Sequence, residues 1–245
     1  MTRLLVLQLD DNDPPARLGD WLTGAGAVLD VVKAHERPVP DGFADHRGLV
    51  VLGGAMGALD DVDHPWLADV RKLLSHAVSK RVPTLAVCLG AQLLAAATGG
   101  QVRRGPHGPE VGLGLVAKRD VAARDPLFAD LPWTPDVLQF HQDDIALLPP
   151  TAVLLASSPK YPNQAFRVGD LAYGVQFHIE TTPEMVSRWA LGAPEMVADV
   201  PPARLDAERL ERGHEDIREV WQPFAERFVR LVAGEVPVTR NLPLV

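Results

Sequence analysis

The sequence of 245 residues has little of several features that define particular protein classes. Its single cysteine, Cys88, allows no internal disulfide and no zinc site built on cysteine pairs. Lys and Arg total 24 against 32 Asp and Glu, and the resulting net charge of −8 has the wrong sign for binding a nucleic-acid backbone. The longest apolar run, residues 85–97, is shorter than the roughly 18 residues that cross a bilayer. With no signal-like segment, we expect a cytoplasmic protein that binds neither nucleic acid nor membrane.

Short apolar runs that end in glycine or turn residues recur along the first hundred residues. Such runs are typical of buried strands, and they cover Arg3 to Leu9, Leu49 to Leu52 and Thr84 to Val87. Apolar residues at three- and four-residue steps from Leu67 to Val78 predict a helix, with Pro65 in its first turn, and Leu93 to Ala97 predicts a second helix. Strands and helices that alternate in this way build a parallel sheet with helices on both faces, so the sequence predicts an α/β fold.

Beyond Val111 the pattern changes to short strands separated by proline and glycine, which we expect to extend the sheet or form antiparallel hairpins beside it. These strands are expected at 112–116, 137–140, 153–156, 165–168 and 173–177. After Glu180 an apolar stripe from Ile217 to Leu231 predicts a helix that Pro223 should kink or divide. No repeat or linker separates these parts. We therefore expect one domain over residues 1–245, with a helical extension at about 181–245.

Cys88 lies where an apolar strand ends and a helix is expected to begin. A sharp strand-to-helix turn holds a nucleophile away from the sheet and points the following backbone N–H groups at the atom under attack. The helix N-terminus also stabilises a thiolate, which is the form of cysteine that attacks a carbonyl carbon. The position therefore favours a nucleophile, although a lone cysteine is commonly a small packing residue, and that alternative stays open.

A base for this thiol is available in His178, which follows a predicted strand. Glu180 stands two positions later, so both side chains project to the same face of an extended segment. A carboxylate there would hold the imidazole in one tautomer and stabilise its cation, as in a Cys-His-acid triad. A strand-end histidine beside a surface glutamate has the same spacing. So does a pair of metal ligands, an interpretation that no further His or Cys cluster supports.

A glycine turn, Gly53 and Gly54, follows the predicted strand at 49–52. Glycine lets backbone N–H groups approach a ligand, so the turn could cradle a phosphate or complete an oxyanion hole. The sequence lacks the Gly-x-Gly-x-x-Gly spacing here, and no Gly-Lys-Ser/Thr follows, which disfavours nucleotide binding. A plain tight turn is the remaining alternative.

Three segments taken in order resemble the class I glutamine amidotransferases over roughly residues 4–180. They are Val51-Leu52-Gly53-Gly54, the stretch from Pro83 to Leu94 around Cys88, and Gly174-Val175-Gln176-Phe177-His178-Ile179-Glu180. Each motif is weak alone, but their order makes the combination specific. His141-Gln142-Asp143 and residues 155–167 further resemble the stand-alone branch related to the glutaminase half of GMP synthase. The family often has proline at the positions of Ala55 and Ile179.

The resemblance implies a flavodoxin-like fold and hydrolysis of the glutamine side-chain amide through a γ-glutamyl thioester, without a cofactor or metal. Cys88 would be the nucleophile, His178 the general base and then acid, and Glu180 the residue that orients the imidazole. The backbone N–H groups of Gly54 and Leu89 would stabilise the oxyanion. The resemblance also implies a set of residues that hold the substrate, namely Met56, Gln92, Phe140, Gln142 and Asp143.

Three functions stay open on the sequence. The first is a stand-alone glutaminase that passes ammonia to a separate synthetase subunit, since this chain has no nucleotide-activating loop. The second is a hydrolase of γ-glutamyl peptides or conjugates with the same triad, which an open pocket beyond the scissile amide would favour. The third is a non-catalytic regulatory subunit that has kept the fold, which a Cys88 out of reach of His178 would favour.

Overall fold

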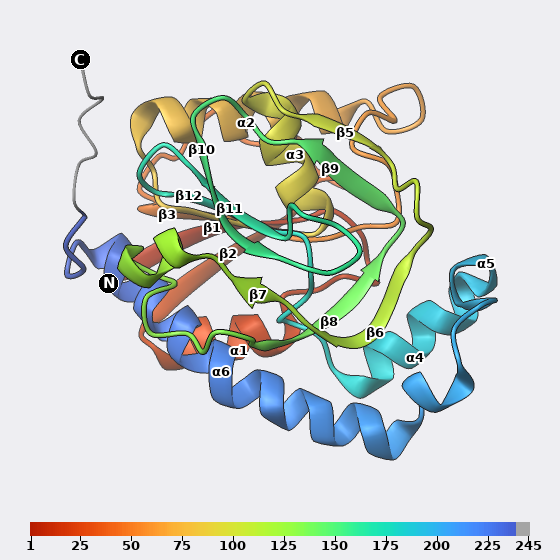
Figure 1. Cartoon of the computed structure of the whole chain (residues 1–245). Helices are drawn as coiled ribbons and strands as arrows, with labels where there is room; N and C mark the ends of the chain where they lie inside the picture. The colour runs from red at the N-terminus through yellow and green to blue at the C-terminus, as the bar shows by residue number, and fades with distance from the viewer. Residues whose placement is uncertain (239–245) are drawn as a thin grey trace.

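A mixed eight-stranded sheet forms the centre of the computed structural model, which describes residues 1–238 (Figure 1). Its strand order is β2-β1-β3-β4-β12-β11-β10-β7. The five parallel strands are β2 (Ala27–Lys33), β1 (Thr2–Gln8), β3 (Gly48–Val51), β4 (Thr84–Val87) and β12 (Ala172–Val175). The antiparallel continuation consists of β11 (Ala165–Val168), β10 (Ala152–Ser157) and β7 (Ala117–Lys118). Two small antiparallel pairs lie beside it, β5 (Gln101–Arg104) with β9 (Asp143–Leu147) and β6 (Glu110–Leu115) with β8 (Asp136–His141).

Helices cover both faces of the sheet. They are α1 (Ala16–Gly24), α2 (Trp66–Lys80), α3 (Leu89–Ala97), α4 (Pro183–Gly192), α5 (Pro194–Val197) and α6 (Ala207–Ala233), with short 3-10 turns at Asp120–Arg124 and Pro202–Arg204. Figure 1 shows α2 and α3 above the sheet and α1 and α6 beneath it. Leu4 and Val6 of β1 belong to the apolar layer with α1 and α6, while Leu5 and Leu7 belong to the layer with α2 and α3.

Burial on both faces explains why the opening strand is a continuous apolar run rather than an alternating one. The expected flavodoxin-like α/β fold, with a mostly parallel sheet and an added antiparallel region, is confirmed. The helix expected from Leu93 begins earlier, at Leu89, directly after Cys88. In the segment after Glu180, helices occupy most of the chain up to Ala233, and the part of the expected extension at 239–245 lies outside the described residues.

Of the two effects expected of Pro223, a kink or a division of the last helix, division does not occur, because α6 runs through this residue as one helix. Pro223 is exposed, so the carbonyl that loses its helical partner faces solvent. The opposite face buries Trp221, Phe224 and Phe228 against the sheet, and this packing holds the helix together across the proline. Among the described residues, none of the helices is long and apolar enough to cross a membrane.

Candidate active site

The carboxyl ends of four neighbouring parallel strands, β1, β3, β4 and β12, meet at one edge of the sheet. In an open α/β sheet this edge is where ligands bind. The register pairs Val87 with Val175, and the N–H of Cys88 donates to the carbonyl of Val175 at 2.8 Å. Cys88 and the segment that carries His178 therefore leave adjacent strands side by side.

Cys88 occupies a strained turn between β4 and α3. Its backbone has φ 50° and ψ −110°, a left-handed region that residues with a side chain rarely adopt. The turn is tight because α3 starts close to β3: Gly90 N–H donates to the carbonyl of Leu52 at 3.2 Å. A Cβ at Gly90 would overlap the carbonyl of Val51, so only glycine permits this approach. This is the strand–turn–helix geometry of a nucleophile elbow.

His178 and Glu180 form a buried pair next to this turn. His178 Nδ1 lies 2.6 Å from Glu180 Oε1, and the other carboxylate oxygen accepts the N–H of Ile179 at 2.9 Å. A proline at the position of Ile179 would have no N–H to give. Burial opposes a charge on the imidazole, but the neighbouring Glu180 and Cys88 outweigh it and raise the pKa of His178 well above its ordinary value.

Two backbone N–H groups predicted to stabilise an oxyanion flank the cysteine. Leu89 is the first residue of α3, and Gly54 is the second residue of the glycine turn after β3. Neither N–H donates to a backbone carbonyl in any of the turn, loop or helix-cap hydrogen bonds of the described residues. The next residue, Ala55, donates its N–H to Asp10 Oδ2 at 3.3 Å, a bond that a proline there would also exclude.

A chain of amide side chains connects the cysteine to β9. Gln176 Nε2 lies 3.8 Å from the sulfur of Cys88, and Gln176 Oε1 accepts a hydrogen bond from Gln92 Nε2 at 3.2 Å. Gln92 Nε2 also lies 3.4 Å from the carbonyl of Asp143. Gln92 was predicted as a substrate contact, and its amide nitrogen is used inside the protein. Gln176 belongs to one of the family motifs but had no predicted role, and the structure places it against the sulfur.

A cavity of about 440 Å³ opens at this edge of the sheet. Its lining includes most of the residues that the sequence singled out, namely Cys88, His178, Gly54, Met56, Gln92, Phe140, Gln142 and Asp143. Glu180 and Leu89 do not line it: the Glu180 side chain lies behind His178, and Leu89 lies at the start of α3. Burial raises the pKa of Asp143 above its ordinary value.

The cavity wall also contains residues that were not predicted from the sequence, and Asp13 and Trp189 lie against or beside the imidazole of His178. Asp13, in the loop after β1, is only 7% exposed, and burial raises the pKa of its carboxyl to about 7. Trp189, from α4, packs against the ring of His178 in a tilted arrangement with 4.8 Å between centroids. Asp13 stands at the end of a predicted parallel strand, and that position alone could have marked it. Trp189 lies in a helix whose docking no motif indicated.

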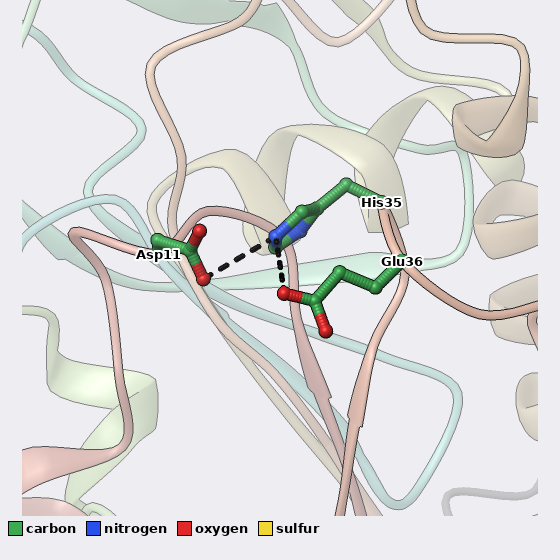
Figure 2. Close-up of side chains that lie close together, drawn as sticks. All are labelled: Asp11, His35 and Glu36. Atoms are coloured by element: carbon green, nitrogen blue, oxygen red, sulfur yellow. Dashed lines mark ion pairs between the residues drawn. The ribbon is translucent and has the colours of Figure 1, made fainter.

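Two other groups of titratable side chains are explained by contacts within the protein. His141 uses both ring nitrogens, with the carbonyl of Asp143 at 2.8 Å and Glu110 Oε2 at 3.1 Å. Figure 2 shows Asp11, His35 and Glu36 close together on the surface. The ammonium of Lys33 lies 2.7 Å from Asp11 and 3.0 Å from Glu36, so a cation already pairs with both carboxylates. We therefore assign this cluster to surface ion pairing.

The comparison with known families agrees with this geometry. Residues 25–188, more than half of the chain, match the sequence profile described as glutamine amidotransferase class-I. The chain therefore belongs to the class I glutamine amidotransferase family.

Curated relatives of two kinds are similar to the chain. Gamma-glutamyl peptidase 4 of Arabidopsis thaliana is 25% identical over 203 residues, which cover 80% of this chain and 78% of the relative. The glutamine-hydrolyzing GMP synthase subunit of Pyrococcus furiosus is 37% identical over 135 residues, which cover 55% of this chain and 66% of the relative. Among solved structures, a glutamine amidotransferase from Thermotoga maritima is 28% identical with a TM-score of 0.81, covering 93% of this chain and 98% of its own.

Proposed function

We propose that this protein hydrolyses a γ-glutamyl amide through a cysteine thioester, with glutamine as the first substrate to test. The observation that carries the proposal is the buried pair of His178 and Glu180 beside a cysteine held in a nucleophile elbow. This arrangement supplies the nucleophile, the base and the residue that orients the base. Membership of the family supports the same chemistry.

The reaction begins when the sulfur of Cys88 attacks the amide carbon and His178 takes up the thiol proton. Glu180 holds Nδ1 of the imidazole, which leaves Nε2 for this transfer. The oxyanion forms beside the N–H groups of Gly54 and Leu89. His178 then returns the proton to the nitrogen, the C–N bond breaks, and ammonia or an amine leaves a γ-glutamyl thioester. Water activated by His178 releases glutamate.

The remaining cavity residues hold the γ-glutamyl group in this proposal. Gln92 and the backbone around Met56, Phe140, Gln142 and Asp143, all on the cavity wall, bind its amide, amino and carboxylate groups. All of them line the same cavity as the reacting sulfur, on segments that follow β3, begin α3 or join β8 to β9.

A second candidate, hydrolysis of γ-glutamyl peptides or conjugates, is favoured by the size of the cavity. Its volume of about 440 Å³ is within the range of pockets that bind drug-sized ligands. The lining continues from Cys88 to Trp189 and Met196 on α4 and α5, so there is room beyond the scissile amide. The relative named a gamma-glutamyl peptidase also aligns with more of this chain than the GMP synthase relative does.

The experiment that tests both candidates measures ammonia and amine release by the purified protein. Glutamine and a panel of γ-glutamyl amides are offered in parallel to the wild type and to Cys88→Ala. Cys88-dependent turnover of glutamine supports the glutaminase, and turnover of conjugates alone supports the second candidate. Absence of turnover with every substrate would overturn autonomous activity and would leave two interpretations, an enzyme that is silent without its partner and a non-catalytic subunit that has kept the fold.

The proposal extends to the setting of the protein. One relative is named as a subunit of a synthase, and in the glutaminase case we propose that the ammonia is passed to a separate synthetase subunit. The single cysteine fits a reducing, cytoplasmic location. We further propose that residues 1–245 form one domain, since α4 contacts the catalytic cavity and α6 packs beneath the sheet.

A further inference from the structure

Asp13 is a buried acid on the cavity wall that the proposed mechanism does not use. Its side chain lines the same cavity as Cys88 and His178. Oδ1 is enclosed in the protein without a hydrogen-bond partner among residues 1–238, and Oδ2 lies on the side of Gly53. Its backbone N–H donates to the carbonyl of Asp10 at 3.1 Å, so the loop fixes its position. A largely buried carboxyl group that makes no hydrogen bond within the protein costs free energy, and a donor that the substrate supplies to Oδ2 would reduce that cost.

The position of Asp13 relative to His178 indicates which substrate atom supplies the donor. The two side chains approach each other across Gly53: a Cβ built there would lie 3.3 Å from His178 Cε1 and 3.6 Å from Asp13 Oδ2. Cε1 is bonded to both ring nitrogens, and Nδ1 is taken by Glu180. The leaving nitrogen must approach Nε2 to receive its proton. Asp13 therefore lies on the same side of the cavity as the imidazole of His178, which in the proposed mechanism gives its proton to the leaving nitrogen.

This inference rests on the proposed function: we propose that Asp13 contacts the substrate directly and that its Oδ2, the oxygen on the side of Gly53 and His178, accepts a hydrogen bond from the N–H of the scissile nitrogen. The bond holds the nitrogen with its lone pair toward His178. It strengthens as the nitrogen gains a proton and positive charge, so it stabilises the transition state more than the bound substrate. The ligand class is a γ-glutamyl amide that carries at least one N–H on its scissile nitrogen.

Proton transfer does not involve Asp13 in this step. The proton that the nitrogen gains comes from His178, which took it from Cys88, and the C–N bond breaks as the sulfur–carbon bond is retained. Asp13 accepts a hydrogen bond without gaining or losing a proton. Both a carboxyl group and a carboxylate have an oxygen that can accept, so the contact forms on either side of the pKa of about 7 that burial gives Asp13.

The test compares substrates that differ only in the donor. Glutamine has two N–H groups on the scissile nitrogen, γ-glutamyl methylamide has one, and the γ-methyl ester of glutamate has none. All three pass through the same thioester. The ratio kcat/KM reports acylation, the step in which the scissile nitrogen is still bound. The wild type is compared with Asp13→Ala, Asp13→Leu and Asp13→Asn, with Asp63→Ala as the control because Asp63 is exposed and outside the cavity.

We expect Asp13→Ala and Asp13→Leu to lower kcat/KM about 10- to 100-fold for both amides and less than about threefold for the ester. Asp13→Asn keeps an oxygen acceptor and should restore most of the amide activity. The amide-to-ester ratio is measured on one preparation, so partial unfolding of a variant cancels from it. Asp63→Ala should leave the ratio unchanged.

Equal losses for amides and ester would overturn the role of Asp13 and leave the proposed function standing, because such losses would indicate a structural role for the loop. Unchanged amide activity in Asp13→Ala would overturn it as well. Absence of Cys88-dependent turnover by the wild type, with all three substrates, would instead overturn the proposed function and this inference together.

Discussion

The indole ring of Trp189 packs against the imidazole of His178, with centroids 4.8 Å apart and planes inclined by 55°. The centroid of the same indole lies 5.4 Å from the centroid of the Phe140 ring, and the indole N–H donates to the carbonyl of Asn12 at 3.0 Å. Trp189 belongs to α4, so the helical segment after Glu180 supplies one wall of the cavity and ties it to the loop after β1.

Removing this indole should impair the reaction without unfolding the protein. We expect Trp189→Ala to lower kcat/KM about tenfold, because the aromatic contact that holds the His178 ring is lost. Trp189→Phe keeps a ring and loses the hydrogen bond to Asn12, and its loss should be about threefold. Steady-state kinetics with thermal unfolding in parallel measure both effects. Trp133→Ala is the matched control, since Trp133 is 56% exposed and outside the cavity; a similar loss there would contradict the assignment.

The sequence contained enough to predict the sheet edge but not every residue around it. The strands before Gly53 and before Cys88 are short apolar runs that end at glycine or at a reactive residue. The local sequence pattern is sufficient to predict strands of this kind. Their convergence with His178 follows from parallel neighbours whose carboxyl ends share one edge. The pairing of His178 with Glu180 was predictable, because side chains two positions apart on an extended segment project to the same face.

Other features depend on contacts between distant segments. Trp189 contacts His178 only because α4 packs against the cavity. The hydrophobic pattern of a helix does not predict which part of the protein the helix will pack against. The strands β5, β7 and β9 are short, and much of their stabilisation comes from partners elsewhere in the chain. Pro223 was expected to kink or divide its helix, but α6 is not divided there, because packing of its buried aromatic face outweighs the local tendency of proline to end a helix.

Replacing Glu180 by its amide should remove catalysis through the tautomer of His178. Oε2 of Glu180 accepts the N–H of Ile179, so in Glu180→Gln the side-chain oxygen stays there and the NH2 group faces His178 Nδ1. Nδ1 must then accept, which moves the imidazole proton to Nε2 and leaves no base for the thiol. We expect kcat/KM to fall about a hundredfold to ten-thousandfold.

The matched change for this prediction is Glu219→Gln on the exposed face of α6. It removes the same charge and should leave kcat/KM within about twofold of the wild type. Circular dichroism should show that both variants fold. A Glu180→Gln enzyme with nearly full activity would mean that Glu180 does not set the tautomer of His178.

Asp13 should make the stability of the protein depend on pH. Its pKa is about 7 in the folded state against 3.8 for the ordinary group, with burial as the main cause; Glu180 and Asp10 raise it further, and His178 lowers it. Above about pH 7 the folded state must hold a buried anion, and this charge opposes folding. As the pH falls from about 7 toward 4, the folded state binds a proton that the unfolded chain does not, so the contribution of Asp13 becomes more favourable.

The comparison of wild type with Asp13→Asn isolates this effect. The free energy of unfolding of the variant minus that of the wild type should be about 1–3 kcal/mol larger at about pH 8 than at about pH 5, which means that the variant gains stability relative to the wild type as the pH rises. Urea unfolding at the two pH values gives the difference. Asp63→Asn should show no such change, because its carboxyl is exposed in the folded state. A pH-independent difference for Asp13→Asn would mean that Asp13 does not titrate in this range.

Gly90 should be required for the turn that holds Cys88, because α3 begins in contact with β3. In Gly90→Ala the new methyl group would lie 2.9 Å from the carbonyl carbon of Val51 and would overlap its oxygen, so backbone must move. We expect the free energy of unfolding to fall by about 2–4 kcal/mol. Gly24→Ala, where a Cβ meets nothing within 4 Å, should change it by at most about 0.5–1 kcal/mol, in the stabilising direction. Chemical denaturation compares the two, and equal effects would show that the close approach of α3 to β3 does not constrain the turn.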